Sequence, residues 1–490
     1  MRVSHPFGAA ILLFLCVGAP LRLARAGETV EPWEDGTPKR RFATDEAGLK
    51  EGPYVEYYRG GKPAIQASYR HDLLEGAYLE TYESGHPKLR TSYRAGKRNG
   101  KLETFGPDDA PTELSTWVDG ALDGRRQVWR GKRLLVTQTW KLGTFLTYDG
   151  IPAFPRPRDE VTRTVTSILA GELPAAEARA GKGKAERKPK AAPVGPTFPA
   201  SIVGLAAASP ELAKDREGAL RRLRAYRYVC DIPWADIVAG ETETIYAQGA
   251  AVVCAKLGEI SHTPPNPGLP DDVYTVGAKG ASRSNLAWGP QQPATLAMDG
   301  WMDDSDKSNI GAVGHRRWAM SLEMRVVGFG WERTGERDYS AMYVEDTSRV
   351  PPRDLPFLVF PARGWMPSDM FSSHHAFSIA VDPIAALRID TAHLSARVTR
   401  LSADFVPADE TLPIEMSVYE TTALAGRNAF IFRPKGLEVA DGAAYLTEVL
   451  APDPKSHKPT PLVRWITAFA GDPLPEHGSW GGPPEDGSDK

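Results

Sequence analysis

Two histidines are the residues of this sequence whose type and setting best suit chemistry. His315 directly follows Gly314 in the segment GAVGHRRW, and His262 lies 53 positions earlier in the segment GEISH. A glycine before a histidine lets backbone and imidazole approach a site that another side chain would crowd. A neutral imidazole is a metal ligand, a general base or a hydrogen-bonding group. Arg316 and Arg317 add guanidinium groups, which can bind anions such as carboxylate or phosphate. We expect instead that one of them pairs with a neighbouring acid and that the other faces water.

Helices and strands are predicted on either side of these histidines. A capping serine followed by proline predicts that a helix starts at Ser209, and a second helix is predicted over residues 239–257. Strands are predicted over residues 325–330 and 339–344. Short helices that alternate with buried strands indicate a three-layer α/β unit of about 150 residues.

Length and charge limit the classes of protein that fit. The chain has 490 residues, which is too long for one ordinary core, so we expect several domains. Charged residues make up 25% of the chain and the net charge is −3. Bulk electrostatics therefore predict binding to neither nucleic acid nor an anionic membrane.

The first 26 residues have the pattern of an export signal. Arg2 precedes an apolar core, and the small residues Ala24 and Ala26 suit a cleavage site. The apolar core has about 13 residues, fewer than the roughly 20 that cross a bilayer, and no later stretch is longer. We expect cleavage near Ala26 and a mature chain without a transmembrane segment, secreted or held in the periplasm or cell envelope. An uncleaved anchor is the alternative.

The cysteines fit an exported chain. Cys16 falls within the predicted signal, which leaves Cys230 and Cys254 as an even pair and a predicted disulfide. The alternative is two buried free thiols, because cysteine packs well as a small apolar residue.

An internal repeat is visible from about residue 52 to residue 150. It is marked by glycines at a spacing of 24, namely Gly52, Gly76, Gly100 and Gly124, and by aromatic residues at the same spacing, namely Tyr69, Tyr93 and Trp117. A fixed period in this range indicates stacked units, and each unit fits two short strands joined by a glycine turn. We expect one elongated sheet of hairpins. Its aromatic stripe fits packing better than a platform for sugars or peptides.

These units resemble MORN-type repeats in their shorter bacterial form. The steps YRAGKRNG at 93–100 and WVDGALDG at 117–124 carry the resemblance, which covers about 100 residues. It implies a scaffold or an interaction surface and no chemistry.

The order of features over residues 205–350 resembles the CAP superfamily, also called SCP-like domains. The shared features are a long first helix, a second helix followed by His262, the sequence RSNL at 283–286 where the family usually has Gly-Glu-Asn-Leu, a Trp-x-x-acid helix ending at Asp304, a Gly-His step at His315 and a Val-Gly strand. The resemblance implies a central α/β/α sandwich with a cleft.

In many members of this family two histidines and two acids line a central cleft that can hold a divalent metal. Carried over by position, His262, His315 and Asp304 are the expected ligands of zinc or another divalent metal, an open three-ligand site. The family's glutamate is replaced by Ser284, which offers no carboxylate to act as a base or to neutralise a metal. The residues expected to contact a bound ligand are Ser284, Asn285 and Arg316.

Each of these residues also has a plainer interpretation. The two histidines fit hydrogen-bonding core residues that join helices to the sheet. Asp304 lies in the run DDSD, which suits a solvated acidic turn with capping ability. Ser284 lacks the Gly-x-Ser-x-Gly setting of a serine nucleophile. Trp301 and Trp318 are expected in the core.

The C-terminal third contains seven strand candidates separated by polar turns. This pattern predicts a β-sandwich over residues 355–471, immunoglobulin-like in architecture. His374 and His375 precede one of the strands. Such a pair could bind a metal, but adjacent side chains leading into a strand point to opposite faces, so we interpret this pair as structural.

The predicted fold class is a multidomain α+β chain. The expected order is an export signal at 1–26, a MORN-type repeat sheet at 40–150, a helix and a flexible linker at 151–200, a CAP/SCP-like α/β/α sandwich at 205–350, a β-sandwich at 355–471 and a disordered tail at 472–490. The Ala-, Pro- and Lys-rich composition of the linker leaves too little apolar surface to fold, and a tether for polyanions is its alternative.

Modularity, export and the missing glutamate favour a binding protein of the cell envelope or the extracellular space. Its expected partner is an envelope protein, a peptide or a glycan, and not nucleic acid. The alternative is a metal-dependent, peptidase-like hydrolase in which His262 and His315 hold a zinc-bound water. That water needs a general base, which Ser284 does not supply.

Overall fold

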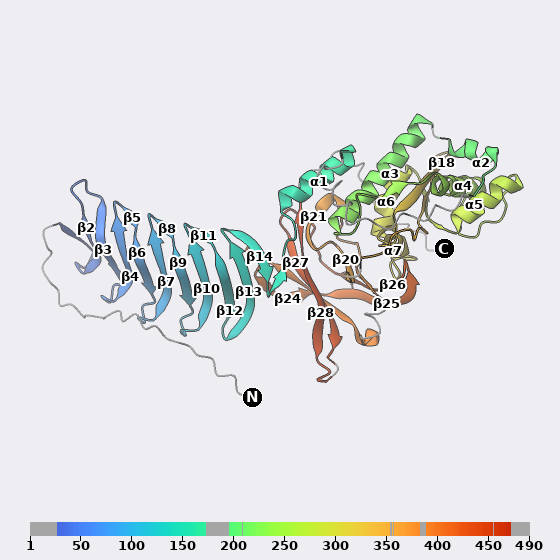
Figure 1. Cartoon of the computed structure of the whole chain (residues 1–490). Coiled ribbons are helices and arrows are strands. Elements are labelled where there is room, and N and C mark those ends of the chain that lie inside the picture. The colour runs from blue at the N-terminus through green and yellow to red at the C-terminus, as the bar shows by residue number, and fades with distance from the viewer. Residues whose placement is uncertain are drawn as a thin grey trace. The chain divides into compact units, whose positions relative to one another are not determined.

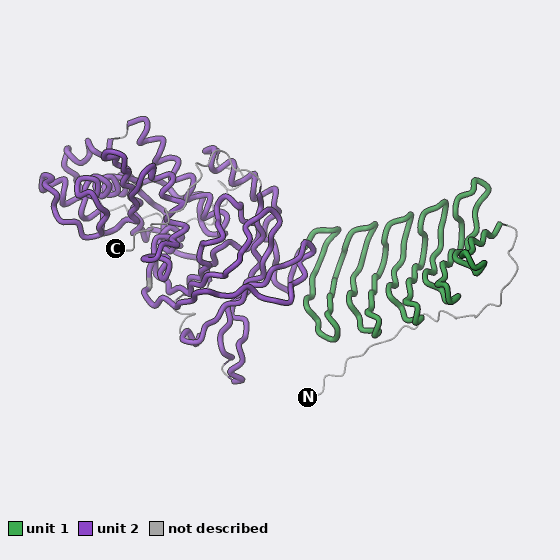
Figure 2. The backbone as a smooth tube through the Cα atoms, turned by 180° about the vertical axis from the view of Figure 1, so that it is seen from behind, with its two compact units in different colours: residues 1–145 green, residues 146–490 purple. Residues whose placement is uncertain are grey.

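The computed structural model describes residues 27–172, 196–207, 209–352, 355, 357–382, 389–453 and 455–471. The predicted export signal, most of the predicted linker and the predicted disordered tail lie outside the described residues. The chain forms two compact units, residues 1–145 and 146–490, which are coloured green and purple in Figure 2.

The first unit is built from consecutive antiparallel hairpins (Figure 1). Its strands are β1 (Glu28–Pro32), β2 (Pro38–Thr44), β3 (Lys50–Tyr57), β4 (Pro63–Arg70), β5 (Leu73–Leu74), β6 (Gly76–Thr81), β7 (Pro87–Arg94), β8 (Lys97–Arg98), β9 (Gly100–Phe105), β10 (Pro111–Val118), β11 (Ala121–Leu122), β12 (Gly124–Arg130) and β13 (Arg133–Lys141). The hairpins fall where the 24-residue spacing of glycines predicts them.

Tyrosines explain why this spacing recurs. The Tyr58 hydroxyl donates to the carbonyl of Thr81 at 2.6 Å, and the Tyr82 hydroxyl donates to the carbonyl of Phe105 at 2.9 Å. Each of these two bonds therefore joins one repeat to the main chain of the next.

The aromatic stripe of the repeats consists of rings that contact one another. Tyr54 and Tyr69 pack edge to face with centroids 5.3 Å apart, and Tyr78 and Tyr93 do the same at 5.5 Å. Edge-to-face pairs at this distance stabilise the sheet beyond the burial of their area. The stripe thus serves packing within each repeat.

The second unit combines helices with several small sheets. Its helices are α1 (Arg158–Ala170), α2 (Ala200–Ala206), α3 (Pro210–Val229), α4 (Glu241–Leu257), α5 (Asp271–Ala281), α6 (Ala294–Asp303) and α7 (Gly314–Ala319). The Ser209 hydroxyl accepts a hydrogen bond from the Leu212 N–H at 3.2 Å, so α3 starts at the predicted capping serine. In the described part of the chain, none of the helices combines the length and the apolarity that a membrane span needs.

Strands β14 (Thr144–Tyr148) and β15 (Ile151–Pro152) are the last two of the 15-stranded sheet. The strands that follow form three further sheets. The first, in spatial order, contains β16 (Val238–Ala239), β18 (Val326–Thr334), β19 (Arg337–Tyr343) and β17 (Ser284–Gly289). The second contains β20 (Phe357–Phe360), β22 (Phe377–Val381), β26 (Arg427–Pro434) and β25 (Ile414–Leu424). The third contains β21 (Gly364–Pro367), β28 (Pro459–Ala470), β27 (Ala444–Pro452), β23 (Ser395–Leu401) and β24 (Pro407–Leu412).

The predicted fold class, a multidomain α+β chain with a central α/β/α sandwich and a separate C-terminal β-sandwich, is wrong. The described chain is mostly β, 42% strand against 22% helix, its largest sheet has 15 strands, and no α/β/α sandwich is evident in it. Helices and strands assigned to the two sandwiches share one hydrophobic core, which includes Trp301, Phe329, Phe360 and Trp465. The pattern of alternating elements predicted the elements but could not show that their apolar faces meet in one core.

The predicted disulfide is not formed. Cys230 and Cys254 are both free thiols. Cys254 lies in a hydrophobic cluster with residues of α4 and β19, whereas Cys230 packs against the larger core that contains Trp301. Burial raises the pKa of Cys230 to about 12 and also raises the pKa of Cys254, so both remain thiols.

Helix α4 lies directly on β18, and two glycines make this approach feasible. A Cβ atom at Gly328 would meet the carbonyl carbon of Glu243 at 2.1 Å, and one at Gly330 would meet the carbonyl oxygen of Ala247 at 2.3 Å. The same packing sets the position of the C-terminal end of α4, from which the chain continues to His262.

We expect Gly330→Ala to lower the free energy of unfolding by about 1–3 kcal/mol, because the added methyl group forces α4 away from the strand. The matched control is Gly204→Ala in α2, where a Cβ atom meets nothing within 4 Å. This control should be neutral or slightly stabilising. Thermal unfolding followed by circular dichroism compares the two variants, and equal midpoints would contradict the packing described here.

Candidate functional site

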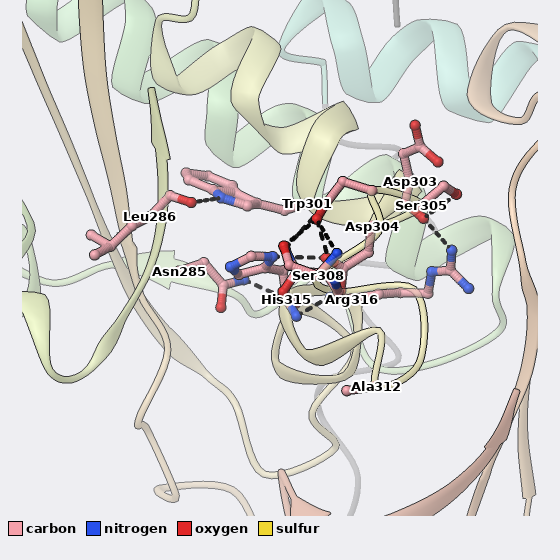
Figure 3. Close-up of polar contacts among 12 residues, drawn as sticks. Asn285, Leu286, Trp301, Asp303, Asp304, Ser305, Ser308, Ala312, His315 and Arg316 are labelled. Atoms are coloured by element: carbon pink, nitrogen blue, oxygen red, sulfur yellow. Dashed lines mark hydrogen bonds and ion pairs between the residues drawn. The ribbon is translucent and has the colours of Figure 1, made fainter. Parts of the chain in front are cut away.

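The candidate site is organised by the turn that ends α6. Asp304 caps this helix in the left-handed conformation, with φ 52° and ψ 31°, and its N–H donates to the Gly300 carbonyl at 2.9 Å. Aspartate tolerates this conformation better than most residues. The turn separates two neighbouring carboxylates, and Figure 3 shows the side chains of Asp303 and Asp304 pointing in different directions.

The carboxylate of Asp304 holds the beginning of α7. It accepts hydrogen bonds from the backbone N–H of His315 at 2.9 Å and of Arg316 at 3.4 Å, and from His315 Nδ1 at 2.8 Å (Figure 3). The Asp304 side chain is only 1% exposed. An ionised carboxylate only accepts, so Nδ1 of His315 carries a proton and Nε2 of the neutral ring keeps its lone pair. Asp304 is therefore not the solvated turn residue of the plainer interpretation, but the capping ability that this interpretation gave it is confirmed.

Charge and burial act in opposite directions on His315. Burial lowers the pKa of its imidazole, but the hydrogen bond that the ring donates to Asp304, the charge of Asp304 and the charge of Asp306 together raise the pKa above its ordinary value. The folded chain therefore favours the protonated ring of His315 more than water favours a free imidazole.

His262 is oriented by a different acceptor. Its Nδ1 lies 2.8 Å from the carbonyl oxygen of Ala281, the last residue of α5. A carbonyl can only accept, so this nitrogen is the donor and Nε2 again keeps its lone pair. Both predicted histidines thus have one ring nitrogen engaged and the other available.

His262 and His315 line one pocket of about 400 Å³ together with Ser284 and Asn285. The amide of Asn285 donates to the carbonyl of His315 at 2.9 Å, which ties the start of β17 to α7. Ser284 is 4% exposed, and its hydroxyl has no hydrogen-bond partner among the described residues. The structure therefore brings together four of the residues that the sequence singled out.

The carboxylates near the pocket are engaged. Glu345 lines the pocket but forms an ion pair with Arg283 at 3.3 Å. Asp304 lies on the Nδ1 side of His315 and is not among the residues that line this pocket. Within the described chain, His262, His315 and Asp304 are not one of the groups whose ligand atoms all lie within 4.8 Å of one another.

Arg316 turns away from this pocket and is 1% exposed. Its guanidinium donates to the carbonyls of Met302, Asp303 and Ala376 at 2.6–2.7 Å and lies over the ring of Phe360. Arg317 is 5% exposed and also donates to main-chain carbonyls, including that of Thr422. The prediction that one of these arginines pairs with an acid and the other faces water is wrong. Burial lowers the pKa of each to about 10, yet both stay charged at neutral pH.

Sequence reasoning missed a second cluster on the other side of the same turn. Asp303, His374 and His375 place ligand atoms within 4.8 Å of one another. Burial raises the pKa of Asp303 and lowers the pKa of His375 well below its ordinary value. His374 and His375 lie in a turn before β22, so both reach the same carboxylate. The only sequence signal was the histidine doublet itself, because nothing links it to a residue 71 positions earlier.

A scan against protein-family models and a search of the curated proteins both find no match for this chain.

We expect Asp304→Asn to lower the pKa of His315, because the charge and hydrogen bond that raise it are lost or weakened while burial remains. The adjacent variant Asp303→Asn is the matched control and should leave this pKa unchanged. Titration of the His315 ring by NMR in both variants measures the effect. An unchanged pKa in Asp304→Asn would refute the assignment of Asp304 as the partner.

The pair formed by His315 and Asp304 should make the free energy of unfolding depend on pH. A raised pKa in the folded state means that the pair stabilises fully below the unfolded pKa of about 6.5, and that this stabilisation is lost as pH rises through the folded pKa. The stability difference between the wild-type chain and Asp304→Asn should therefore shrink as pH rises. A difference that grows with pH would contradict the sign.

Proposed function

We propose that this chain is an exported binding protein of the cell envelope or the extracellular space. The pocket lined by His262, Ser284, Asn285 and His315 takes a small ligand that donates hydrogen bonds. The observation that carries the proposal is the buried, unpartnered hydroxyl of Ser284 in the same pocket as two imidazoles whose Nδ1 atoms are already engaged.

The polar groups of the pocket favour a ligand that donates hydrogen bonds. Each imidazole in its neutral form offers a lone pair at Nε2, because its Nδ1 proton is held by Ala281 or Asp304. The Ser284 hydroxyl can accept and donate, and burial without a partner costs it about 1–3 kcal/mol until a ligand or water satisfies it. Amines, amides and sugar hydroxyls supply the matching groups, which are the groups of peptides and glycans.

The sequence resemblances support the same class of function. The ordered motifs around His262 and His315 resemble the CAP superfamily, and the hairpin repeats resemble MORN-type repeats. In this proposal the repeat sheet contacts an envelope partner, and the N-terminal pattern directs export. The proposal concerns binding and does not require a central α/β/α sandwich.

A hydrolase is the second candidate, favoured by the His315–Asp304 pair. In many acyl-transfer sites a histidine acts as the general base, and a buried carboxylate that accepts its Nδ1–H orients the ring, as Asp304 does for His315 here. The Ser284 hydroxyl, however, makes no hydrogen bond to His315. Two imidazoles are also fewer than the three protein ligands of a catalytic zinc site, so binding is the better supported function.

Binding can be tested with the full chain and two probe mixtures, one of short peptides and one of amino sugars. A ligand of the pocket should shift the NMR signals of His262 and His315 together. Ser284→Ala should weaken binding about threefold to tenfold, the value of one hydrogen bond.

Ser282→Ala is the matched control, because the Ser282 hydroxyl also lies at the pocket but already donates to the carbonyl of Lys279 at 3.0 Å. It should bind as the wild-type chain does. Equal losses in both serine variants, or no shift with either mixture, would argue against the pocket. Zinc-dependent turnover of the peptides would favour the hydrolase.

A further inference from the structure

The group formed by Asp303, His374 and His375 lies outside the pocket described above. Asp303 is the last residue of α6, and the two histidines precede β22. His375 Nε2 lies 3.2 Å from Asp303 Oδ1, and His374 Nε2 lies 3.3 Å from Asp303 Oδ2. Two elements far apart in sequence thus meet at one carboxylate.

These separations match those of ligands on a single metal ion. Metal–nitrogen and metal–oxygen bonds of about 2.1 Å at a tetrahedral angle place neighbouring ligand atoms about 3.4 Å apart. Two imidazoles and one carboxylate are also a ligand set that first-row divalent metals use. The side chains are therefore already near the geometry that an ion requires.

Two buried atoms of the group lack partners. The side chains of Asp303 and His375 are 3% and 7% exposed, yet Asp303 Oδ1 and His375 Nδ1 have no hydrogen-bond partner among the described residues. His375 Nε2 is close enough to Oδ1 for a hydrogen bond but does not form one. An unpartnered carboxylate oxygen is costly in such a place, and an ion bound to it would remove that penalty.

The surroundings leave one side of the group open. Phe371 packs edge to face on His375 with centroids 4.8 Å apart, and the ring of Phe360 lies on it at 6.4 Å. The His374 side chain is 50% exposed. An ion could therefore enter from the side of His374, and a water molecule could complete its coordination there.

Arg316 is the charged group that opposes a cation at this position. Its guanidinium donates to the main-chain carbonyls of Asp303 and Ala376, next to two of the three ligands. The ionised carboxylate of Asp303 offsets one positive charge, so binding is weaker than at a site with two carboxylates.

We propose that Asp303, His374 and His375 form a binding site for a divalent transition metal, with zinc as the best match, that ties the end of α6 to the turn before β22. The site is separate from the pocket of His262 and His315. It uses the neighbour of Asp304, so the metal also holds in place the turn from which Asp304 reaches His315. A second group, Asp45, Glu51 and His71, offers the same atom types, but none of its three residues is buried, and we assign nothing to it.

The test uses the full chain after treatment with a chelator, dialysed against zinc or cobalt at neutral pH. Metal content by mass spectrometry and the visible absorption of cobalt report binding. We expect one metal ion per chain in the wild-type protein and binding at least about tenfold weaker in His374→Ala and Asp303→Asn. Zinc should raise the thermal midpoint of the wild-type chain and leave that of His374→Ala unchanged.

Two histidine variants serve as controls that should keep the metal. His393→Ala removes an exposed histidine that contacts Asp390 at 2.9 Å, and His262→Ala removes a residue of the other pocket. His374 is half exposed, so its variant retains the fold even if Asp303→Asn does not. No metal in the wild-type chain, equal binding in His374→Ala, or loss confined to His262→Ala would each overturn the proposal.

Discussion

The hydrogen bonds of the Asp304 carboxylate are the constraint on which the candidate site depends. This one buried group accepts from two backbone N–H groups at the start of α7 and from the Nδ1 of His315. It therefore decides where α7 begins, how the imidazole is turned and which ring nitrogen keeps a lone pair. The position of this carboxylate depends in turn on the left-handed backbone conformation that Asp304 itself adopts at the end of α6. A single backbone conformation thus orders the pocket.

The same turn divides two adjacent carboxylates between two environments. Asp304 contacts an imidazole that is 21% exposed at the pocket, whereas Asp303 faces His374 and His375 beside an aromatic wall. The arginine between them, Arg316, donates only to main-chain carbonyls and to a serine hydroxyl, and so joins α6 and α7 to the strand segment near Ala376 without neutralising either acid directly. Ligand binding at one side and metal binding at the other would therefore act on the same turn of backbone.

Local patterns in the sequence predicted the parts of this molecule better than their assembly. The 24-residue spacing located the hairpins, and the capping serine located the start of α3, because both signals act over a few residues. The pattern of alternating helices and strands gave the wrong fold class, since shared burial in one core is a long-range property. The pocket residues were predicted as a set by resemblance. The group of Asp303, His374 and His375 could not be predicted in this way, because its carboxylate and its histidines lie about 71 positions apart and meet only in the folded chain.

The protonation state of the His315 ring tests the central claim most directly. Nitrogen-15 NMR of the histidine rings distinguishes a proton on Nδ1 from a proton on Nε2 in the neutral imidazole. Above the pKa of His315, the full chain should show the Nδ1–H form, held by Asp304, with Nε2 free to accept. The opposite form, with the proton on Nε2, would mean that Asp304 does not orient the ring and would contradict the account.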